Sequence, residues 1–99
     1  TPHEGLQLDE ARARIQYQGR PLTLTRYEYL LLKTLIQHPG RVYSRGQLLD
    51  LVWAPGEESL ERTVDTHIKT LRAKLHEIDP QANPILTHRG LGYSLSESA

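Results

Sequence analysis

The stretch RTVDTHIKTLRAKL, residues 62–75, decides the fold class of this chain. Its large apolar residues recur at intervals of three and four positions, at Val64, Ile68, Leu71 and Leu75. On a helix these side chains form one narrow stripe that has to pack against a core. The opposite face is polar or small, with Arg62, Thr66, Lys69, Thr70 and Ala73. The pattern predicts an amphipathic helix over about residues 60–76.

The charge of this helix differs from that of the whole chain. The 99 residues carry 12 Lys and Arg against 12 Asp and Glu, and the pI is about 6.9. From Arg62 to Lys74, however, four basic residues stand against a single acidic one, Asp65. An acidic run precedes them: Asp50, Glu57, Glu58 and Glu61. Because binding depends on the local field, the polar face suits a DNA major groove, where cations reach phosphates or guanine and threonine reaches base edges.

Two capping boxes predict two shorter helices upstream. In TRYE at 25–28 and in SRGQ at 44–47, the first and fourth side chains can satisfy each other's backbone amides. Apolar residues follow each box at helical spacing. The sequence HPG at 38–40 stops the first helix, and the second is expected to end near Trp53.

Both ends of the chain alternate with a period of two, which is typical of strands. The N-terminal pairs are Leu6 and Leu8, Ile15 and Tyr17, and Leu22 and Leu24. Residues 85–95 alternate again around the glycine-bounded tip at 90–92, which predicts a hairpin. The order predicts an α+β fold, a winged helix-turn-helix with an N-terminal antiparallel sheet, a three-helix bundle and a C-terminal β-hairpin wing.

Composition narrows the function classes. Ninety-nine residues make one domain, and the lack of cysteine excludes disulfides and thiolate zinc sites. No apolar run approaches the roughly 18 residues of a membrane helix and no signal peptide is visible, so we expect a cytoplasmic protein. The five histidines lack metal-ligand spacing, and there is no nucleophile elbow or Gly-rich phosphate loop. We therefore expect no enzyme, no cofactor and no bound metal.

Four blocks of the sequence resemble the effector domain of the OmpR/PhoB family of bacterial response regulators. They are LTRYEYLLL at 24–32, PGRVYSR at 39–45, RTVDTHIKTLRAKL at 62–75 and THRGLGY at 87–93. The resemblance implies a four-stranded N-terminal sheet, a three-helix bundle and a wing, in a domain spanning 6–96. It also implies that a phosphorylatable receiver domain, absent from this chain, precedes the domain, with residues 1–5 as a linker remnant.

The resemblance further implies sequence-specific binding to double-stranded DNA, as the output domain of a two-component transcriptional regulator. The helix at 60–76 would enter the major groove and the wing at 85–95 the minor groove, with tandem dimers on direct repeats. The acidic loop at 54–60 matches a segment that touches RNA polymerase in some members. By position, the implied DNA contacts are Arg62, Thr63, Thr66, Lys69, Thr70 and Arg72 of the helix and Thr87 and Arg89 of the wing.

Some positions leave alternatives open. Thr70 and Lys69 stand where other members can carry arginines, and lysine lacks the bidentate fork, so the bases read are undetermined. His88 is interpreted either as a phosphate contact or as an exposed residue. A winged helix can also dock an acidic protein through the same basic face.

Three further residues have structural interpretations. We expect Trp53 to pack in the core or at its edge, although the family places a DNA-backbone contact near it. Tyr93 is expected to anchor the wing on the core. Asp65 is expected to hold a neighbouring cation, either Lys69 at i+4 or Arg72 at i+7.

Overall fold

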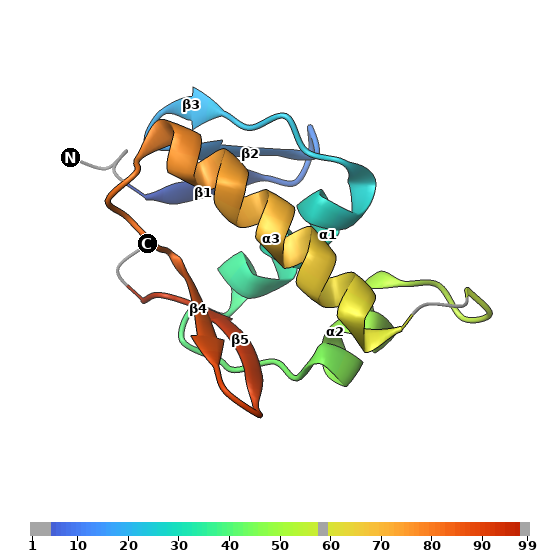
Figure 1. The fold of residues 1–99 in the computed structure, drawn as a ribbon. Helices are drawn as coiled ribbons and strands as arrows, with labels where there is room; N and C mark the ends of the chain where they lie inside the picture. The colour runs from blue at the N-terminus through green and yellow to red at the C-terminus, as the bar shows by residue number, and fades with distance from the viewer. Residues whose placement is uncertain (1–4, 58–59, 98–99) are drawn as a thin grey trace.

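The computed structural model describes residues 5–57 and 60–97. Its elements follow in the order β1 (Leu6–Asp9), β2 (Arg14–Tyr17), β3 (Arg20–Pro21), α1 (Arg26–Gln37), α2 (Arg45–Val52), α3 (Glu61–Ile78), β4 (Ile85–His88) and β5 (Gly92–Leu95). The first three strands form one antiparallel sheet and the last two form the wing. Figure 1 shows α3 crossing the molecule between the two sheets. This order confirms the predicted α+β architecture.

The N-terminal sheet is smaller than the resemblance implies. Within the described residues it has three strands, in the order β1-β2-β3, and not four. The turn at 18–19 has positive φ at both residues, the arrangement that fits hairpin twist. β3 ends at Pro21, although the next amide, that of Leu22, still donates to the carbonyl of Ile15 (3.0 Å). The strand expected around Leu22 and Leu24 is wrong, and both side chains pack half-buried against the core.

Local sequence signals set where the helices begin. α1 and α2 both start with complete capping boxes, at 25–28 and at 44–47. α3 starts after Leu60, which forms no side-chain cap among the described residues, and it ends at Ile78, slightly beyond the predicted position 76. None of the helices in the described ranges is both long and apolar enough to cross a membrane.

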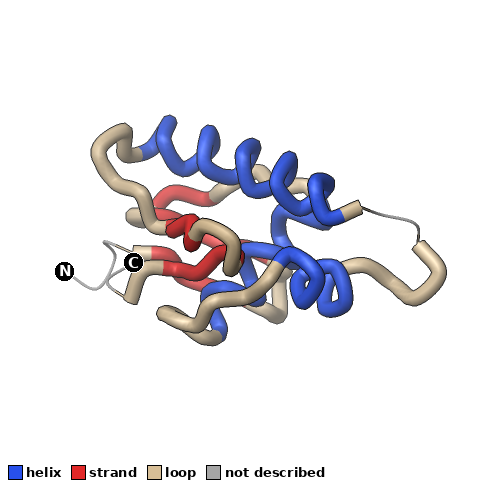
Figure 2. Tube along the Cα trace, turned by 60° about the horizontal axis from the view of Figure 1, so that its bottom comes forward, coloured by secondary structure: helices blue, strands red, loops and turns tan. Residues whose placement is uncertain are grey.

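The core is one apolar cluster on the inner side of α3. The predicted stripe is fully buried: Val64, Ile68, Leu71 and Leu75. It joins buried leucines of α1 and α2 and the wing residues Ile85 and Leu95. Figure 2 shows α3 lying along one side of the molecule, with strands and the other helices beneath it. The outer side of α3 is therefore left to solvent.

The wing is fixed to the loop between α1 and α2. Tyr43 and Tyr93 exchange two backbone hydrogen bonds of 2.8 Å each. The two backbones approach so closely that a Cβ on Gly92 would lie 1.9 Å from the carbonyl oxygen of Tyr43. Gly92 also has φ of 138°, so this position requires glycine on both counts. The Tyr93 ring is buried, which confirms its predicted anchoring role.

Candidate nucleic-acid interface

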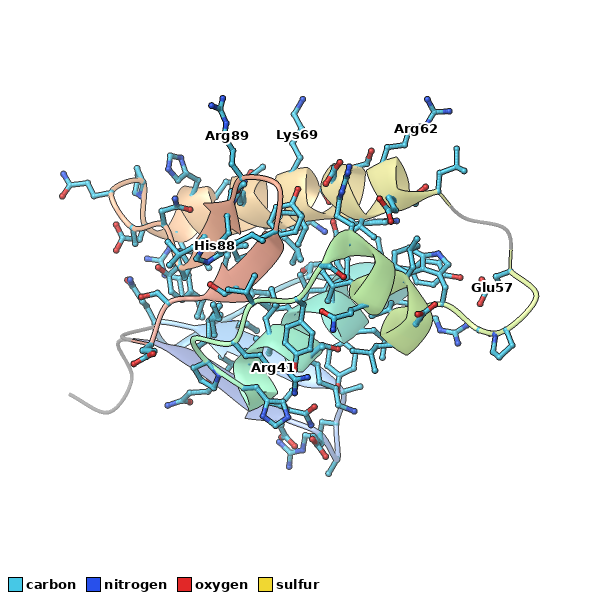
Figure 3. The ribbon with its side chains drawn as sticks, turned by 90° about the horizontal axis from the view of Figure 1, so that it is seen from below. Arg41, Glu57, Arg62, Lys69, His88 and Arg89 are labelled. Atoms are coloured by element: carbon cyan, nitrogen blue, oxygen red, sulfur yellow. The ribbon has the colours of Figure 1, made fainter. Side chains whose placement is uncertain are left out.

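Three long cations extend from one side of the domain. Arg62 and Lys69 project from α3 and Arg89 from the wing tip, and Figure 3 shows all three pointing the same way, away from the core. The side chains of all three are exposed and make no hydrogen bond or ion pair within the described part of the chain. We call this set the cationic surface; its charges are open to a ligand.

Two threonines lie in the N-terminal half of α3 (Glu61–Lys69). Thr66 is exposed, and its hydroxyl donates to the carbonyl of Arg62 one turn earlier (3.2 Å). Thr63 is half-buried. This half and the wing tip therefore carry five of the eight predicted contacts: Arg62, Thr63, Thr66, Lys69 and Arg89.

The C-terminal half of α3 (Thr70–Ile78) is bonded to α1 instead. Glu28 of α1 is only 3% exposed. Its Oε2 accepts a hydrogen bond from the Thr70 hydroxyl at 2.5 Å. Its Oε1 accepts from Nζ of Lys74 at 2.5 Å and from the amide of Thr25 at 2.9 Å. The hydroxyl of Thr70, a predicted DNA contact, therefore has a charged partner inside the domain.

These hydrogen bonds keep the Glu28 carboxylate ionised. Burial alone would raise its pKa, but the hydrogen bonds from Lys74, Thr70 and the Thr25 backbone, with the Lys74 charge, outweigh burial and lower the pKa from 4.5 to about 2. The Lys74 ammonium is held a second time by the carbonyl of Thr23 (2.8 Å). Removing any one donor would leave a buried charge with poorer compensation.

Arg72 joins α3 to the wing. Its Nη2 donates to the carbonyl of Ile85 at 2.9 Å and to the hydroxyl of Thr87 at 2.5 Å, both on β4. Its Nε is buried and finds no acceptor among the described residues. The guanidinium lies 5.7 Å from the ring centre of Tyr93. Arg72 and Thr87, both predicted to contact DNA, are thus bonded to each other.

Asp65 pairs with a cation from α2 and not with one from its own helix. Its Oδ2 lies 2.9 Å from Nη1 of Arg45, and its Oδ1 accepts from the hydroxyl of Tyr93 at 2.5 Å. The predicted pairing with Lys69 or Arg72 is wrong, because Lys69 extends into solvent and Arg72 is held by β4. Burial, and then Asp65, raise the pKa of Tyr93 to about 12. Asp65 therefore fastens α3 to both α2 and the wing.

His88 has an internal partner on the wing. Its Nε2 lies 2.7 Å from Oγ of Ser94, which is buried. The ring is half-buried, and Figure 3 places it below the wing tip that carries Arg89. The interpretation of His88 as a merely exposed residue is therefore wrong.

An aromatic cluster lies at the C-terminal end of α2, where the following loop begins. Trp53 is buried and stacks on Tyr27 of α1, with ring centres 4.6 Å apart and planes 7° apart. His67 of α3 lies 5.7 Å from each of these rings. The packing role expected for Trp53 is confirmed.

The same loop is tied back through Glu57. One carboxylate oxygen accepts from the amide of Ala54 at 2.8 Å, and the other accepts from the hydroxyl of Tyr27. The hydrogen bond from Tyr27 is the main cause that lowers the pKa of Glu57. Glu58 of the acidic run lies outside the described residues, as do residues 1–4 of the expected linker.

Glu28 has a role that the capping-box pattern alone does not predict. A signal is nevertheless present, because Glu28 precedes Leu31, Leu32 and Leu35 by three, four and seven positions and so lies on the buried face of α1. Arg45 has no comparable local signal, since its partner Asp65 is 20 residues away.

The interface offers charge and hydrogen-bond donors. Within residues 5–57 and 60–97, no three His, Asp or Glu side chains gather as a metal ion would need. Arginine presents a planar fork and lysine a compact charge, and both suit phosphate oxygens. The cationic surface therefore fits an extended polyanion.

Comparison with known proteins identifies the family. Residues 19–95 match the family model described as "Transcriptional regulatory protein, C terminal". The chain belongs to this family, the effector domains of OmpR/PhoB response regulators. The family is one of transcriptional regulators and not of enzymes.

Two relatives show how far the similarity extends. CreB of Escherichia coli K12 is 61% identical over 89 residues, which cover 90% of this chain and 39% of CreB. PhoB of Pseudomonas aeruginosa is 44% identical over 92 residues, covering 93% of this chain and 39% of PhoB. The chain thus spans about two-fifths of the length of these curated relatives.

Solved OmpR/PhoB effector domains share the fold. The DNA-binding domain of AdeR, solved in complex with an intercistronic region, has a TM-score of 0.82 at 30% identity and covers 93% of this chain and 94% of its own. The CpxR domain of E. coli has a TM-score of 0.79 at 33% identity, covering 97% and 94%. The RstA domain of Klebsiella pneumoniae, in complex with the RstA box, has 0.77 at 26% identity, covering 93% and 91%. These likenesses confirm the winged-helix architecture.

Proposed function

We propose that this OmpR/PhoB effector domain binds double-stranded DNA sequence-specifically, as the output domain of a bacterial two-component regulator. α3 enters the major groove and the β4–β5 wing the minor groove. The cationic surface carries the proposal, because three cations from two separate elements extend to one side and have no partner among residues 5–57 and 60–97. The AdeR and RstA domains, which share the fold, are themselves in complex with DNA, and this supports the proposal.

The proposed contacts come from the N-terminal half of α3 and the wing tip. Arg62 and Lys69 reach phosphates or guanine edges, and Arg89 enters the minor groove, where the potential is most negative. Thr66 and Thr63 meet a base edge, a thymine methyl or a phosphate. The remaining implied contacts are bonded within the domain and hold it in shape: Thr70, Arg72 and Thr87.

The family also supports proposals about the intact protein. Because the relatives are much longer than this chain, we propose a receiver domain before it, joined by the linker that ends in residues 1–5. The intact regulator acts in the cytoplasm and occupies direct repeats as a tandem dimer. The acidic loop at 54–60, held to α1 through Glu57, is the proposed contact for RNA polymerase.

One observation favours the alternative of a protein partner. Leu91 at the wing tip is 66% exposed and stands two residues from Arg89, so an apolar and cationic surface could dock an acidic protein. The two functions differ in what Arg62 and Lys69 do. If neutralising both leaves DNA affinity unchanged, protein docking is the function of this face.

The test is a binding titration at several salt concentrations against a pool of random-sequence duplexes, followed by sequencing of the bound fraction. We expect enrichment of a direct repeat with half-sites about one helical turn apart and a steep salt dependence. The matched control is Arg41→Ala, which removes an exposed cation that lies away from the cationic surface and should change neither result (Figure 3). Weak binding at low salt with no enriched motif would contradict the proposal.

A further inference from the structure

One buried carboxylate connects α1 to the C-terminal half of α3, two elements far apart in sequence. Among the described residues, Glu28 is the one charged residue with less than a tenth of its surface exposed. Its two oxygens accept hydrogen bonds from the Thr25 amide at the N-terminus of α1 and from the Thr70 and Lys74 side chains in the C-terminal half of α3. The contacts to α3 span 42 and 46 residues of sequence, so they are formed only in the folded domain.

The spacing of the two donors makes this contact sensitive to how α3 sits. Thr70 and Lys74 are four residues apart, which is slightly more than one helical turn. Thr70 has a short side chain, so its hydroxyl reaches the carboxylate over only a narrow range of α3 rotations, whereas the long, flexible Lys74 side chain tolerates a wider range. A small rotation would leave one oxygen of a buried anion without its donor, which is costly. Glu28 therefore restrains the rotation of α3, chiefly through Thr70.

Helix geometry also explains why the polar face of α3 meets solvent at its N-terminal end and α1 at its C-terminal end. Each step of four residues turns about 40° beyond a full turn, since an α-helix has 3.6 residues per turn. The series Arg62, Thr66, Thr70 and Lys74 therefore drifts around α3. Arg62 extends into solvent, whereas Thr70 and Lys74 have reached α1. The rotation that seats Lys74 on Glu28 is the one that aims Arg62 and Thr66 outward.

We propose that Glu28 is a positioning residue for DNA recognition: it holds the hydroxyl of Thr70 away from base edges and sets which residues of α3 face the groove. This inference rests on the proposed function, because it concerns how α3 meets DNA. Thr70 contributes no hydrogen bond to base recognition, although the sequence resemblance implies a contact there. The bases are read from the N-terminal half of α3.

A pair of variants at Thr70 separates the two roles of its side chain. Thr70→Val keeps the methyl group and removes the hydroxyl, whereas Thr70→Ser keeps the hydroxyl and removes the methyl. We expect Thr70→Val to lose the preference at no single base position; because it removes one of the two α3 donors to Glu28, the preferences should weaken slightly and together. The carboxyl resonance of Glu28, followed by NMR, should show a higher pKa in Thr70→Val and an unchanged one in Thr70→Ser. Loss of a base preference at one position in Thr70→Val, with the Glu28 pKa unchanged, would overturn the proposal.

Glu28→Gln tests positioning against a purely structural role. Both roles lower stability, so binding is measured at a temperature where circular dichroism shows the variant folded. Positioning predicts that preferences weaken together at several base positions, reducing the ratio of specific to random-sequence affinity about tenfold, which is the size of one good base contact. The salt slope should stay unchanged, because Arg62, Lys69 and Arg89 remain. Unchanged base preferences in the folded variant would overturn the proposal.

Controls keep the outcomes distinct. Glu77→Gln removes an exposed carboxylate from the same helix and should change neither the preferences nor the salt slope. If Glu28→Gln does not fold, the Thr70→Val selection decides alone. If the parent domain enriches no motif, the proposed function fails. If the parent enriches a motif and Glu28→Gln retains every preference, only the positioning role fails.

Discussion

The two halves of α3 carry the same kinds of polar residue and use them differently. In the N-terminal half, Arg62 and Lys69 extend into solvent with no partner in the described part of the chain. In the C-terminal half, Thr70 and Lys74 are bonded to Glu28, and Arg72 is bonded to β4. The types of residue on a helix face therefore do not decide which of them meet a ligand. Whether a position is free to bind a ligand depends on which elements pack beside it. In the C-terminal half of α3, side chains are bonded to α1 and to the wing.

The largest expected effect is on stability, and it is seen by comparing variants of two lysines of the same helix. Lys74→Met leaves the buried Glu28 carboxylate without its cation, and we expect the free energy of unfolding to fall by about 2–3 kcal/mol, reduced from the full cost of a broken buried pair because Lys74 is partly exposed. Lys69→Met, the matched control, should change it by less than about 0.5 kcal/mol. Urea denaturation of both variants checks this. Equal effects would remove the distinction between the two halves.

Acid should act on the same contact. Because the pKa of Glu28 is about 2 in the folded domain and 4.5 without these partners, the ionised form adds stability above pH 4.5. That contribution is lost as the pH falls from about 4.5 to 2, and it amounts to about 2 kcal/mol after allowance for solvent near Lys74.

The measurement is denaturant unfolding between pH 5 and pH 2.5. Glu28→Gln serves as the reference, since its other carboxyl groups titrate as in the parent. The parent should lose stability more steeply than Glu28→Gln over this range. Parallel curves would mean that Glu28 is not held as the structure shows.

Sequence reasoning predicts the parts of this domain that depend on near neighbours. The capping boxes at 25–28 and 44–47 and the buried stripe of α3 are local patterns, and the structure has all of them. The three-strand sheet differs from expectation because β3 ends at Pro21, whereas the alternation of Leu22 and Leu24 is typical of a further strand.

The division of α3 into two halves could not be predicted in the same way. The partners of Thr70, Arg72 and Asp65 come from α1, β4 and α2, at sequence separations of 42, 13 and 20 residues. A helical wheel shows which side of α3 is polar, but it does not show which neighbour covers each turn. The contacts implied by the resemblance therefore stay predictions until binding is measured.

The next largest effect concerns phosphate contacts. It compares the two halves of α3 by the salt dependence of DNA binding. Each of Arg62→Ala and Lys69→Ala should lower the slope of log affinity against log salt by about 0.9, because one fewer counterion is released. Lys74→Met should leave the slope unchanged while lowering stability. Fluorescence anisotropy on one operator duplex at 50–200 mM salt measures all three. If Lys74→Met lowers the slope as much as Lys69→Ala does, the C-terminal half of α3 also contacts phosphate.

The smallest expected effect applies the same comparison to the wing. Arg89 at its tip has no partner in the described ranges, whereas Arg72 of α3 is bonded to β4 at its base. Arg89→Ala should weaken binding about threefold more on operators with A·T-rich flanks than on those with G·C-rich flanks, because a narrow A·T minor groove attracts arginine more strongly. Arg72→Ala loosens the wing as a whole and should weaken both kinds of operator equally. Paired titrations on the two flank types measure this difference. Equal losses for Arg89→Ala would show that the wing tip does not enter the minor groove, whereas a flank dependence in Arg72→Ala would assign Arg72 to DNA after all.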